Sequence, residues 1–415
     1  MRKLSHRARL DRLAAVAVNV GLRPAKGQEV ILTANVETLP LARLISKHAY
    51  LRGASLVTTI LADDALSLAR FHHSNDEYFD HTTPWLFDGI AKAITDGAAR
   101  MAIVGDNPNL LSGLDGNKVM RTVQARSQAA RKTQELLMGF HCNWSGVSYA
   151  GKAWARMVFP NLPPRQAVKE LWEAIFKASR VDGEDPVTNW MTHNANLAAR
   201  RDWLTDQNFH ALHFKGPGTD LIVGLAQGHQ WCGGAETAKN GITCNPNIPT
   251  EEVFTTPNSR LTMGVVTSTK PLSYQGQVIE GIQARFADGK IVSASAVKGD
   301  EALQRMLNMD DGARHLGEVA LVPHSSPISQ SGLLFFNTLF DENAASHIAQ
   351  GRAYPFCMQD YRTATVEDLA ARGANDSKIH VDWMIGSQHM DVDGVHTDGT
   401  SVPVMRKGEW AQTIV

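Results

Sequence analysis

The C-terminal half of the chain contains acidic and histidine side chains of the types that bind borderline divalent metals such as zinc, cobalt and manganese. Two glutamates are adjacent in Pro-Thr-Glu-Glu-Val-Phe (249–254), and another precedes an apolar run in Leu-Gly-Glu-Val-Ala-Leu-Val (316–322). Others lie in Asp-Glu-Asn-Ala-Ala-Ser-His (341–347) and His-Val-Asp-Trp-Met-Ile (380–385). One catalytic zinc ion needs fewer ligands than this, whereas two metals sharing a carboxylate would use them all. The candidates are Glu252, Glu318, His347, Tyr354, His380 and Asp382.

The spacing of four candidates indicates how they could face a common site. His380 and Asp382 are two residues apart, so both would point to one face of a strand. His347 and Tyr354 are seven residues apart, which predicts one face of a helix. Tyrosine is an uncommon ligand because the pKa of its phenol is about 10, and it could instead polarise a substrate carbonyl. Each feature has an ordinary alternative, such as a buried hydrogen bond, so none identifies a metal site alone.

The candidate glutamates lie next to apolar segments. If the segment of Glu251 and Glu252 is extended, their side chains point to opposite sides, so only one can face a given metal directly. Glu318 precedes a strongly apolar strand, where a carboxylate must be paired, hydrated or metal-bound. The alternative for each glutamate is a surface charge at the end of a strand.

Bulk composition is that of an ordinary globular protein. The 415 residues favour two domains, with 43% hydrophobic and 20% charged residues. A net charge of −1 gives no electrostatic reason to expect nucleic acid or an anionic membrane as partner, and no apolar run has the length of a membrane span. The four cysteines form no Cys-x-x-Cys pair, which favours a reducing, cytoplasmic compartment. The basic N-terminus predicts an amphipathic helix rather than a targeting peptide, with Leu10, Leu13, Ala14 and Ala17 on one face.

The first half alternates between apolar strand patterns and helical patterns. Strands are expected at 29–36, 55–61 and 100–105, the second of them with a buried-strand pattern, and helices at 37–51 and 85–98. Repeated strand–helix–strand units predict a parallel sheet with helices on its faces. Without a Gly-x-Gly-x-x-Gly or Walker sequence, this Rossmann-like α/β half has no support for nucleotide binding.

A mainly helical stretch follows over 112–198, and strand patterns begin near Phe209. Ala287-Asp-Gly predicts a hairpin between strands at 277–286 and 290–296. We therefore expect an α/β protein with an N-terminal domain over 1–205. A C-terminal, strand-rich α+β domain over 206–415 would carry the metal site.

Together these segments resemble the M29 family of metallo-aminopeptidases, the aminopeptidase T and aminopeptidase S group. The resemblance covers essentially the whole chain. It is densest in Pro-Thr-Glu-Glu-Val-Phe-Thr-Thr-Pro (249–257), Gly-Val-Val-Thr-Ser-Thr-Lys-Pro-Leu (264–272) and Leu-Phe-Asp-Glu-Asn-Ala-Ala-Ser-His-Ile-Ala (339–349). Leu-Gly-Glu-Val-Ala-Leu-Val and His-Val-Asp-Trp-Met-Ile-Gly-Ser (380–387) also match it.

The resemblance implies a homodimer that removes N-terminal amino acids from peptides with a free N-terminus. It also implies two divalent metal ions per subunit (zinc, cobalt, manganese or magnesium). The charge balance described above predicts no nucleic-acid or membrane partner. Choosing Glu252 over Glu251 rests on the family's spacing to Glu318. Carried over position by position, the metal ligands would be Glu252, Glu318, His347, Tyr354, His380 and Asp382.

Hydrolysis at such a centre also needs a carboxylate outside the ligand set, as general base and acid. Glu251 is the first candidate because it adjoins a ligand, and Glu342 is the second. Tyr354 could assist by polarising the substrate carbonyl. Replacing Glu251 with glutamine would then keep both metals and greatly slow turnover.

Two other readings stay open. Some ring-cleaving dihydroxypyridine dioxygenases resemble this family but hold one ferrous iron with two histidines and an aspartate, here His347, His380 and Asp382. Glu252 and Glu318 argue against that reading, because a mononuclear iron site has no use for them. A non-enzymatic two-domain binding protein would require all six features to be unrelated hydrogen-bonding groups.

Overall fold

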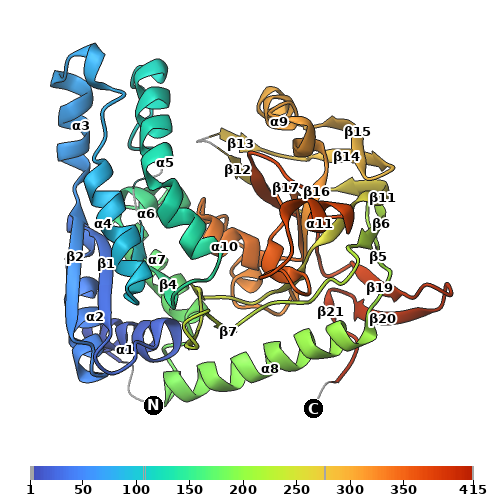
Figure 1. Ribbon diagram of the computed structural model, residues 1–415, viewed down its shortest axis with the longest axis horizontal. Coiled ribbons are helices and arrows are strands. Elements are labelled where there is room, and N and C mark those ends of the chain that lie inside the picture. Colours follow the sequence, from blue (N-terminus) through green and yellow to red (C-terminus); the bar gives the residue numbers. More distant parts are fainter. Residues whose placement is uncertain (1–3, 106, 108, 275–276, 414–415) are drawn as a thin grey trace. The chain divides into compact units, whose positions relative to one another are not determined.

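The computed structural model describes residues 4–105, 107, 109–274 and 277–413 (Figure 1). The chain forms two compact units. One comprises Met1–Thr192 with Ala235–Pro249, and the other comprises His193–Gly234 with Thr250–Val415. The division falls within helix α8 (Pro186–Gln207), which also contains the expected domain boundary at residue 205. That boundary stays a prediction, and all six candidate ligands belong to the second unit.

A five-stranded parallel sheet forms the centre of the first unit. Its strand order is β2-β1-β3-β4-β9, and every neighbouring pair is parallel. The three strands expected from the alternating patterns are therefore present and parallel. The strands are β1 (Glu29–Asn35), β2 (Leu56–Ala62), β3 (Ala99–Val104), β4 (Trp144–Ser148) and β9 (Asn247–Ile248).

Helices connect these strands, as the alternating pattern predicts. Leu10, Leu13 and Ala14 on the first helix are buried, as is Ala17 at the start of the π-helix Ala17–Leu22 that continues it, so the predicted apolar face is confirmed. A short two-stranded hairpin, β7 (Glu236–Thr237) with β8 (Thr243–Cys244), also belongs to this unit. The helices are α1 (His6–Val16), α2 (Leu39–Leu51), α3 (Asp64–His73), α4 (Pro84–Thr95), α5 (Gly116–Met138), α6 (Lys152–Val158) and α7 (Pro164–Ala178).

Strand β2 departs from the prediction of a buried strand. It lies at the edge of the sheet, and every one of its residues is exposed or half-exposed. Leu56 and Leu61 are 50% and 48% exposed within the chain. An apolar run predicts a strand but does not distinguish the centre of a sheet from its edge, which explains the error.

An antiparallel sheet of eight strands forms one layer of the second unit, in the order β15-β14-β11-β6-β5-β19-β20-β21. The predicted hairpin joins β14 to β15 through Asp288 and Gly289, which both have positive φ (48° and 80°) as tight hairpin turns require. Its strands are β5 (Ala211–Gly216), β6 (Thr219–Leu225), β11 (Pro257–Thr267), β14 (Gln283–Ala287), β15 (Lys290–Ser295), β19 (Asp391–Val395), β20 (Ser401–Arg406) and β21 (Glu409–Trp410).

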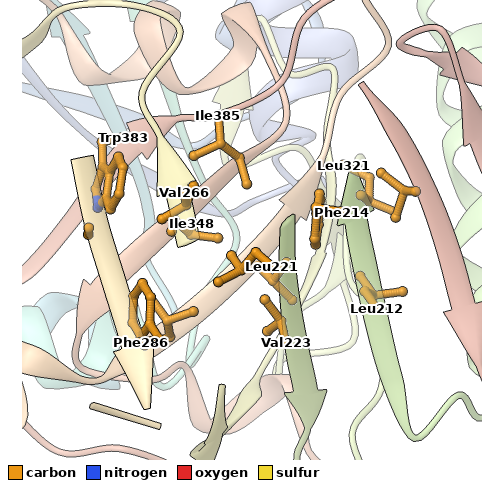
Figure 2. Packing of buried hydrophobic residues seen from close by; sticks show 14 of the residues in the cluster. Leu212, Phe214, Leu221, Val223, Val266, Phe286, Leu321, Ile348, Trp383 and Ile385 are labelled. Atoms are coloured by element: carbon orange, nitrogen blue, oxygen red, sulfur yellow. The ribbon is translucent and has the colours of Figure 1, made fainter. Parts of the chain in front are cut away.

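A smaller antiparallel sheet carries the candidate ligands. Its order is β10 (Val253–Thr255), β16 (Leu316–Leu321), β17 (His347–Gly351) and β18 (His380–Met384). Alternate residues of these strands, including Ile348 on β17, pack into the hydrophobic core of the unit, as period-two side-chain alternation predicts. Burying one such side chain contributes about 1.5–3 kcal/mol. Figure 2 shows core side chains from both sheets, among them Leu212, Phe214, Leu221, Val223, Val266, Phe286, Leu321, Ile348, Trp383 and Ile385.

The remaining elements of the second unit are short. A hairpin pairs β12 (Leu272–Tyr274) with β13 (Gln277–Ile279), so the predicted strand over 277–286 divides into β13 and β14. The short helices are α9 (Asp300–Leu307), α10 (Thr338–Asp341) and α11 (Val366–Ala371). No helix in the described part of the chain is long and apolar enough to cross a membrane.

Candidate metal centre

Three neighbouring strands place four of the candidate ligands. Glu318 lies on β16, His347 begins β17, and His380 and Asp382 lie on β18. Ala349 on β17 pairs with Glu318 on one side and Asp382 on the other, so these three side chains share one face. His380 and Asp382 point to that face because they are two residues apart on a strand, as predicted.

The central strand presents only small groups between the ligands. After His347, the same face of β17 carries Ala349 and then Gly351, which pairs with His380. Gly351 has a φ of 106°, and a Cβ atom there would lie 2.1 Å from the carbonyl oxygen of Ile379. Position 351 therefore requires glycine, and the methyl group of Ala349 separates the two carboxylates.

A β-bulge precedes Glu318. The register of β16 with β17 shifts between Leu316 and Glu318. A Cβ atom at the intervening Gly317 would lie 2.3 Å from the carbonyl oxygen of Arg352. A bulge next to a site redirects a side chain, and here it sets the face to which Glu318 points.

The expected helix through His347 and Tyr354 is absent from this described segment, and that prediction was wrong. The chain leaves His347 as strand β17 and turns at Gly351, and Tyr354 precedes the short 3₁₀ helix Pro355–Cys357. Alternation between core and site face favours a strand here, whereas the seven-residue spacing fits a helix only by coincidence. Tyr354 still reaches the same region, since its ring centroid lies 4.6 Å from that of His380.

The adjacent glutamates precede β10 and are both buried, with 3% of Glu251 and 6% of Glu252 exposed. Paired backbone hydrogen bonds between Cys232 and Phe254 hold this segment in place. Glu252 Oε2 lies 3.2 Å from His347 Nε2. Glu251 Oε2 lies 3.9 Å from His193 Nε2 instead, so the two carboxylates contact different histidines.

Glu318 stands between the two ligand histidines. Its Oε1 lies 3.5 Å from His347 Nε2 and its Oε2 lies 3.3 Å from His380 Nε2. Asp382 Oδ1 lies 3.4 Å from His380 Nε2 and 4.0 Å from His347 Nε2. The side chains form two groups that could each hold an ion, one of Glu252, Glu318 and His347 and one of Glu318, His380 and Asp382, with ligand atoms within 4.8 Å of one another.

Both histidines are oriented by backbone carbonyl groups. His347 Nδ1 lies 3.1 Å from the oxygen of Ala345, and His380 Nδ1 lies 2.7 Å from that of Arg352. A carbonyl oxygen can only accept a hydrogen bond, so the Nδ1 atom of each histidine must be the donor and carry the proton. The lone pair of each neutral imidazole is then on Nε2, which faces the carboxylates, as in histidines that bind metals.

Without a cation, burial and neighbouring charges shift the pKa values of several groups at the centre. Burial raises the pKa of Glu252 above its ordinary value. Burial likewise raises the pKa of Tyr354 well above its usual value, and the surrounding carboxylates add to this. The pKa of Asp382 falls despite burial, because the nearby charges of His380 and His347 outweigh the effect of burial. A bound cation would lower the pKa of the carboxyl groups and of the phenol, because it stabilises their negatively charged forms.

The residues present fit a divalent metal. Glu252 Oε2 and Asp382 Oδ1 are buried and accept no hydrogen bond from the described residues. A buried carboxylate oxygen without a partner costs free energy unless a cation or another donor reaches it. Carboxylate oxygens with two imidazole nitrogens are the ligands that zinc, cobalt and manganese accept.

We predict that metal binding releases protons and strengthens as the pH rises. Burial acts to lower the pKa of His347, but Glu252 and Glu318 raise it well above the usual value. The metal-free protein therefore gains stability from this proton below about pH 6.5, the unfolded value, and loses it as the pH rises through the folded pKa. Metal needs the neutral ring, so the rise in Tm on adding zinc should increase from pH 6 to 8. A rise that is independent of pH would contradict the prediction.

Two groups near the centre were less evident from the sequence. Burial and the charges of Glu252 and Asp382 raise the pKa of Glu342 well above its usual value, so this carboxyl group lies within electrostatic reach of the ligands. Asn343 is fully buried, and its side chain contacts the backbone of Glu251. The sequence indicates Glu342 only as the second candidate for the general base. No sequence pattern points to Asn343.

Comparison with known proteins is consistent with this geometry. The sequence profile described as thermophilic metalloprotease (M29) matches residues 6–410. Aminopeptidase T of Thermus aquaticus is 49% identical over 401 residues, which cover 97% of this chain and 98% of that protein. Aminopeptidase 2 of Geobacillus stearothermophilus is 43% identical over 402 residues, which cover 97% of both chains.

Two solved structures share the fold. Wild-type AmpT from Thermus thermophilus superposes with a TM-score of 0.93 at 48% identity, covering 98% of this chain and all of the other. A 2,5-dihydroxypyridine dioxygenase from Pseudomonas putida superposes with a TM-score of 0.53 at 12% identity, covering 99% of both chains. At that identity the second likeness concerns the fold alone.

Proposed function

The chain belongs to the M29 family of metallo-aminopeptidases and is a peptide hydrolase, and we propose that it removes N-terminal residues with two divalent metal ions bound at the Glu318 centre. Glu318 gives the strongest support, because its two oxygens face different histidines at 3.5 Å and 3.3 Å. A carboxylate between two imidazoles is the arrangement that a shared ligand of two metals needs.

We assign Glu252 and His347 to one ion and His380 and Asp382 to the other, with Glu318 shared. Tyr354, whose ring packs against His380, would complete the second set or donate a hydrogen bond to the substrate carbonyl. Zinc, cobalt, manganese and magnesium are the candidate ions, since availability as well as affinity decides occupancy. Such ions supply a water of lowered pKa and polarise the scissile carbonyl.

Glu342 is our choice for the general base and acid, ahead of Glu251. The carboxyl group of Glu342 interacts electrostatically with Glu252, Asp382, His347 and Glu318. Glu251 Oε2 faces His193 at 3.9 Å, and adjacency in sequence was the reason for preferring it. In our proposal Glu342 takes a proton from the attacking water and returns it to the leaving amine nitrogen, which conserves protons over one turnover.

The dioxygenase alternative is less well supported. A single ferrous iron would use His347, His380 and Asp382. Glu252 and Glu318 lie 3.2 Å and 3.5 Å from His347 Nε2 in the same cluster, although that iron site needs no carboxylate besides Asp382. A hydrolytic site with two metals uses both glutamates.

The test of function is release of the chromophore from a leucine chromogenic amide, with a free or an acetylated N-terminus. Zinc, cobalt, manganese or magnesium would be added to chelator-treated protein. We expect metal-dependent release from the free substrate and none from the acetylated one. Equal cleavage of both would contradict the proposed exopeptidase specificity. No release with any metal, together with iron-dependent oxygen uptake on a dihydroxypyridine, would favour the dioxygenase.

We also propose that the protein is a homodimer that uses the outer face of the eight-stranded sheet. Leu261, Met263 and Val265 on β11 are 43–52% exposed and form an apolar row. Asp220 on β6 and Arg285 on β14 both pair with Val265, from opposite sides. A twofold axis along this row would bring Asp220 of one copy opposite Arg285 of the other.

Met263→Asp should therefore weaken the dimer at least about tenfold, since like charges would meet in an apolar contact at a cost of several kcal/mol. The mass in solution, measured by light scattering over a dilution series, reports this. Val366→Asp on α11, which is 69% exposed, serves as a matched control. A dimer unaffected by Met263→Asp would rule out this face.

A cytoplasmic location is part of the same proposal. All four cysteines are buried, and none of them forms a disulfide bond. Buried cysteines without disulfide bonds are typical of proteins in reducing compartments.

A further inference from the structure

We propose that Asn343 is a positioning residue, which fixes the carboxyl group of Glu342 relative to the segment that carries Glu252. The proposal rests on the role of Glu342 as general base given above. Asn343 follows Glu342 directly in the 3₁₀ helix Glu342–Ala344, and none of its surface is exposed. A buried amide must have its hydrogen bonds satisfied, so its partners reveal what it holds.

The two ends of the amide face different parts of the centre. Asn343 Oδ1 accepts a hydrogen bond of 2.6 Å from the backbone N–H of Glu251, the residue before Glu252. Asn343 Nδ2 donates to the carbonyl oxygen of Leu339 at 3.1 Å and to Glu342 Oε1 at 3.4 Å. One planar group therefore connects the proposed base with the segment before β10 that carries Glu252.

These partners determine the orientation of the amide. The N–H of Glu251 can only donate, so it requires the oxygen. The carbonyl of Leu339 can only accept, so it requires the nitrogen. An aspartate at position 343 would keep the acceptor for Glu251 but turn a second oxygen toward Leu339 and Glu342. Only an asparagine side chain can accept from Glu251 and donate to Leu339 and Glu342 at the same time.

The residues around Asn343 are held as well. Ser326 Oγ, itself buried, donates to the carbonyl oxygen of Asn343 at 3.1 Å. On the other side of Glu342, the buried carboxylate of Asp341 accepts the N–H groups of Phe335 and Asn337 at 2.7 Å and 3.0 Å. The backbone on both sides of Glu342 is thus fixed, and the amide of Asn343 fixes the side chain.

The experiment compares Asn343→Asp and Asn343→Ala in the wild-type protein and in Glu342→Gln. We expect kcat to fall about 10- to 100-fold, as for groups that orient catalytic residues, with KM within about twofold and metal content unchanged. In the Glu342→Gln background the same substitutions should have no further effect on kcat, because they act through that carboxylate. Asn308→Asp, at an exposed position, controls for the change of amide to carboxylate.

Three outcomes would overturn the proposal. One is an equal loss of kcat with and without Glu342, which would make the two residues independent. Another is loss of metal or of the native fold in both variants, which would make Asn343 a structural residue. The third is wild-type turnover in both. An inactive wild-type protein would instead count against the proposed function, so the two failures are distinguishable.

Discussion

Replacing Glu318 with glutamine is expected to abolish binding of both metal ions and to lower kcat/KM at least about 10³-fold. Glu318 belongs to both groups of candidate ligands and lies within 3.5 Å of both histidines. Charge stabilisation by metal is worth several kcal/mol in such reactions, and about 1.4 kcal/mol corresponds to a factor of ten in rate. Metal content by mass spectrometry and turnover of the leucine amide measure the two effects.

The stability of the same variant separates this explanation from simple misfolding. Without metal, Glu318 adds negative charge to a buried cluster that also contains Glu252, Asp382 and Glu342, but it also pairs with His347 and His380. Its neutral replacement removes both effects, so the metal-free protein should stay folded with a Tm close to that of the wild type, while zinc no longer raises the Tm. Glu301→Gln, at a side chain that is 95% exposed, is the control. Two bound metals in Glu318→Gln would refute the shared-ligand assignment.

Glu342→Gln should have the second large effect, a fall in kcat of about 10²- to 10⁴-fold, which is the usual contribution of a general acid–base group. Glutamine has nearly the same shape but cannot take a proton from the attacking water. Both metals should stay bound, because Glu342 lies outside the two ligand groups. Steady-state kinetics and metal analysis of the same preparation give both quantities.

Glu251→Gln is the matched comparison, since it makes the same change in a neighbouring buried carboxylate. We expect a clearly smaller loss of kcat, because Glu251 Oε2 faces His193. The reverse order, with Glu251→Gln nearly inactive and Glu342→Gln nearly normal, would return the role of base to Glu251.

Much of the fold follows from hydrophobic periodicity. Three strands of the parallel sheet, the helical character around α5 and the Asp288–Gly289 hairpin were predictable, because repeating patterns and turn residues specify local structure. Strand β4 was not predicted, since it lies inside the stretch 112–198 that was expected to be mainly helical, and the two-residue strand β9 is too short to give a pattern. The exposure of β2 was not predictable in the same way. It depends on which strand lies at the edge of the sheet, and a single apolar run carries no such information.

The metal centre was likewise predictable only where a local pattern specifies the structure. His380 and Asp382 were placed correctly, since a strand puts residues i and i+2 on one face. His347 was assigned to a helix because a spacing of seven also fits helical geometry, although β17 is extended. The bulge before Glu318 and the amide of Asn343 depend on contacts between distant segments, so no local pattern reveals them.

Two small residues of β17 lie on the same face of the sheet as the candidate ligands. Ala349 lies between Glu318 and Asp382 in the register of the sheet, and Gly351 beside it tolerates no side chain. Zinc binds oxygen at about 2.0–2.2 Å and calcium at about 2.3–2.6 Å with more ligands, so we expect the size of the side chain at position 349 to affect which ion the centre accepts. Selection among ions would then depend on one position that binds none of them. A redesign of metal preference would begin at residue 349 and leave every ligand in place.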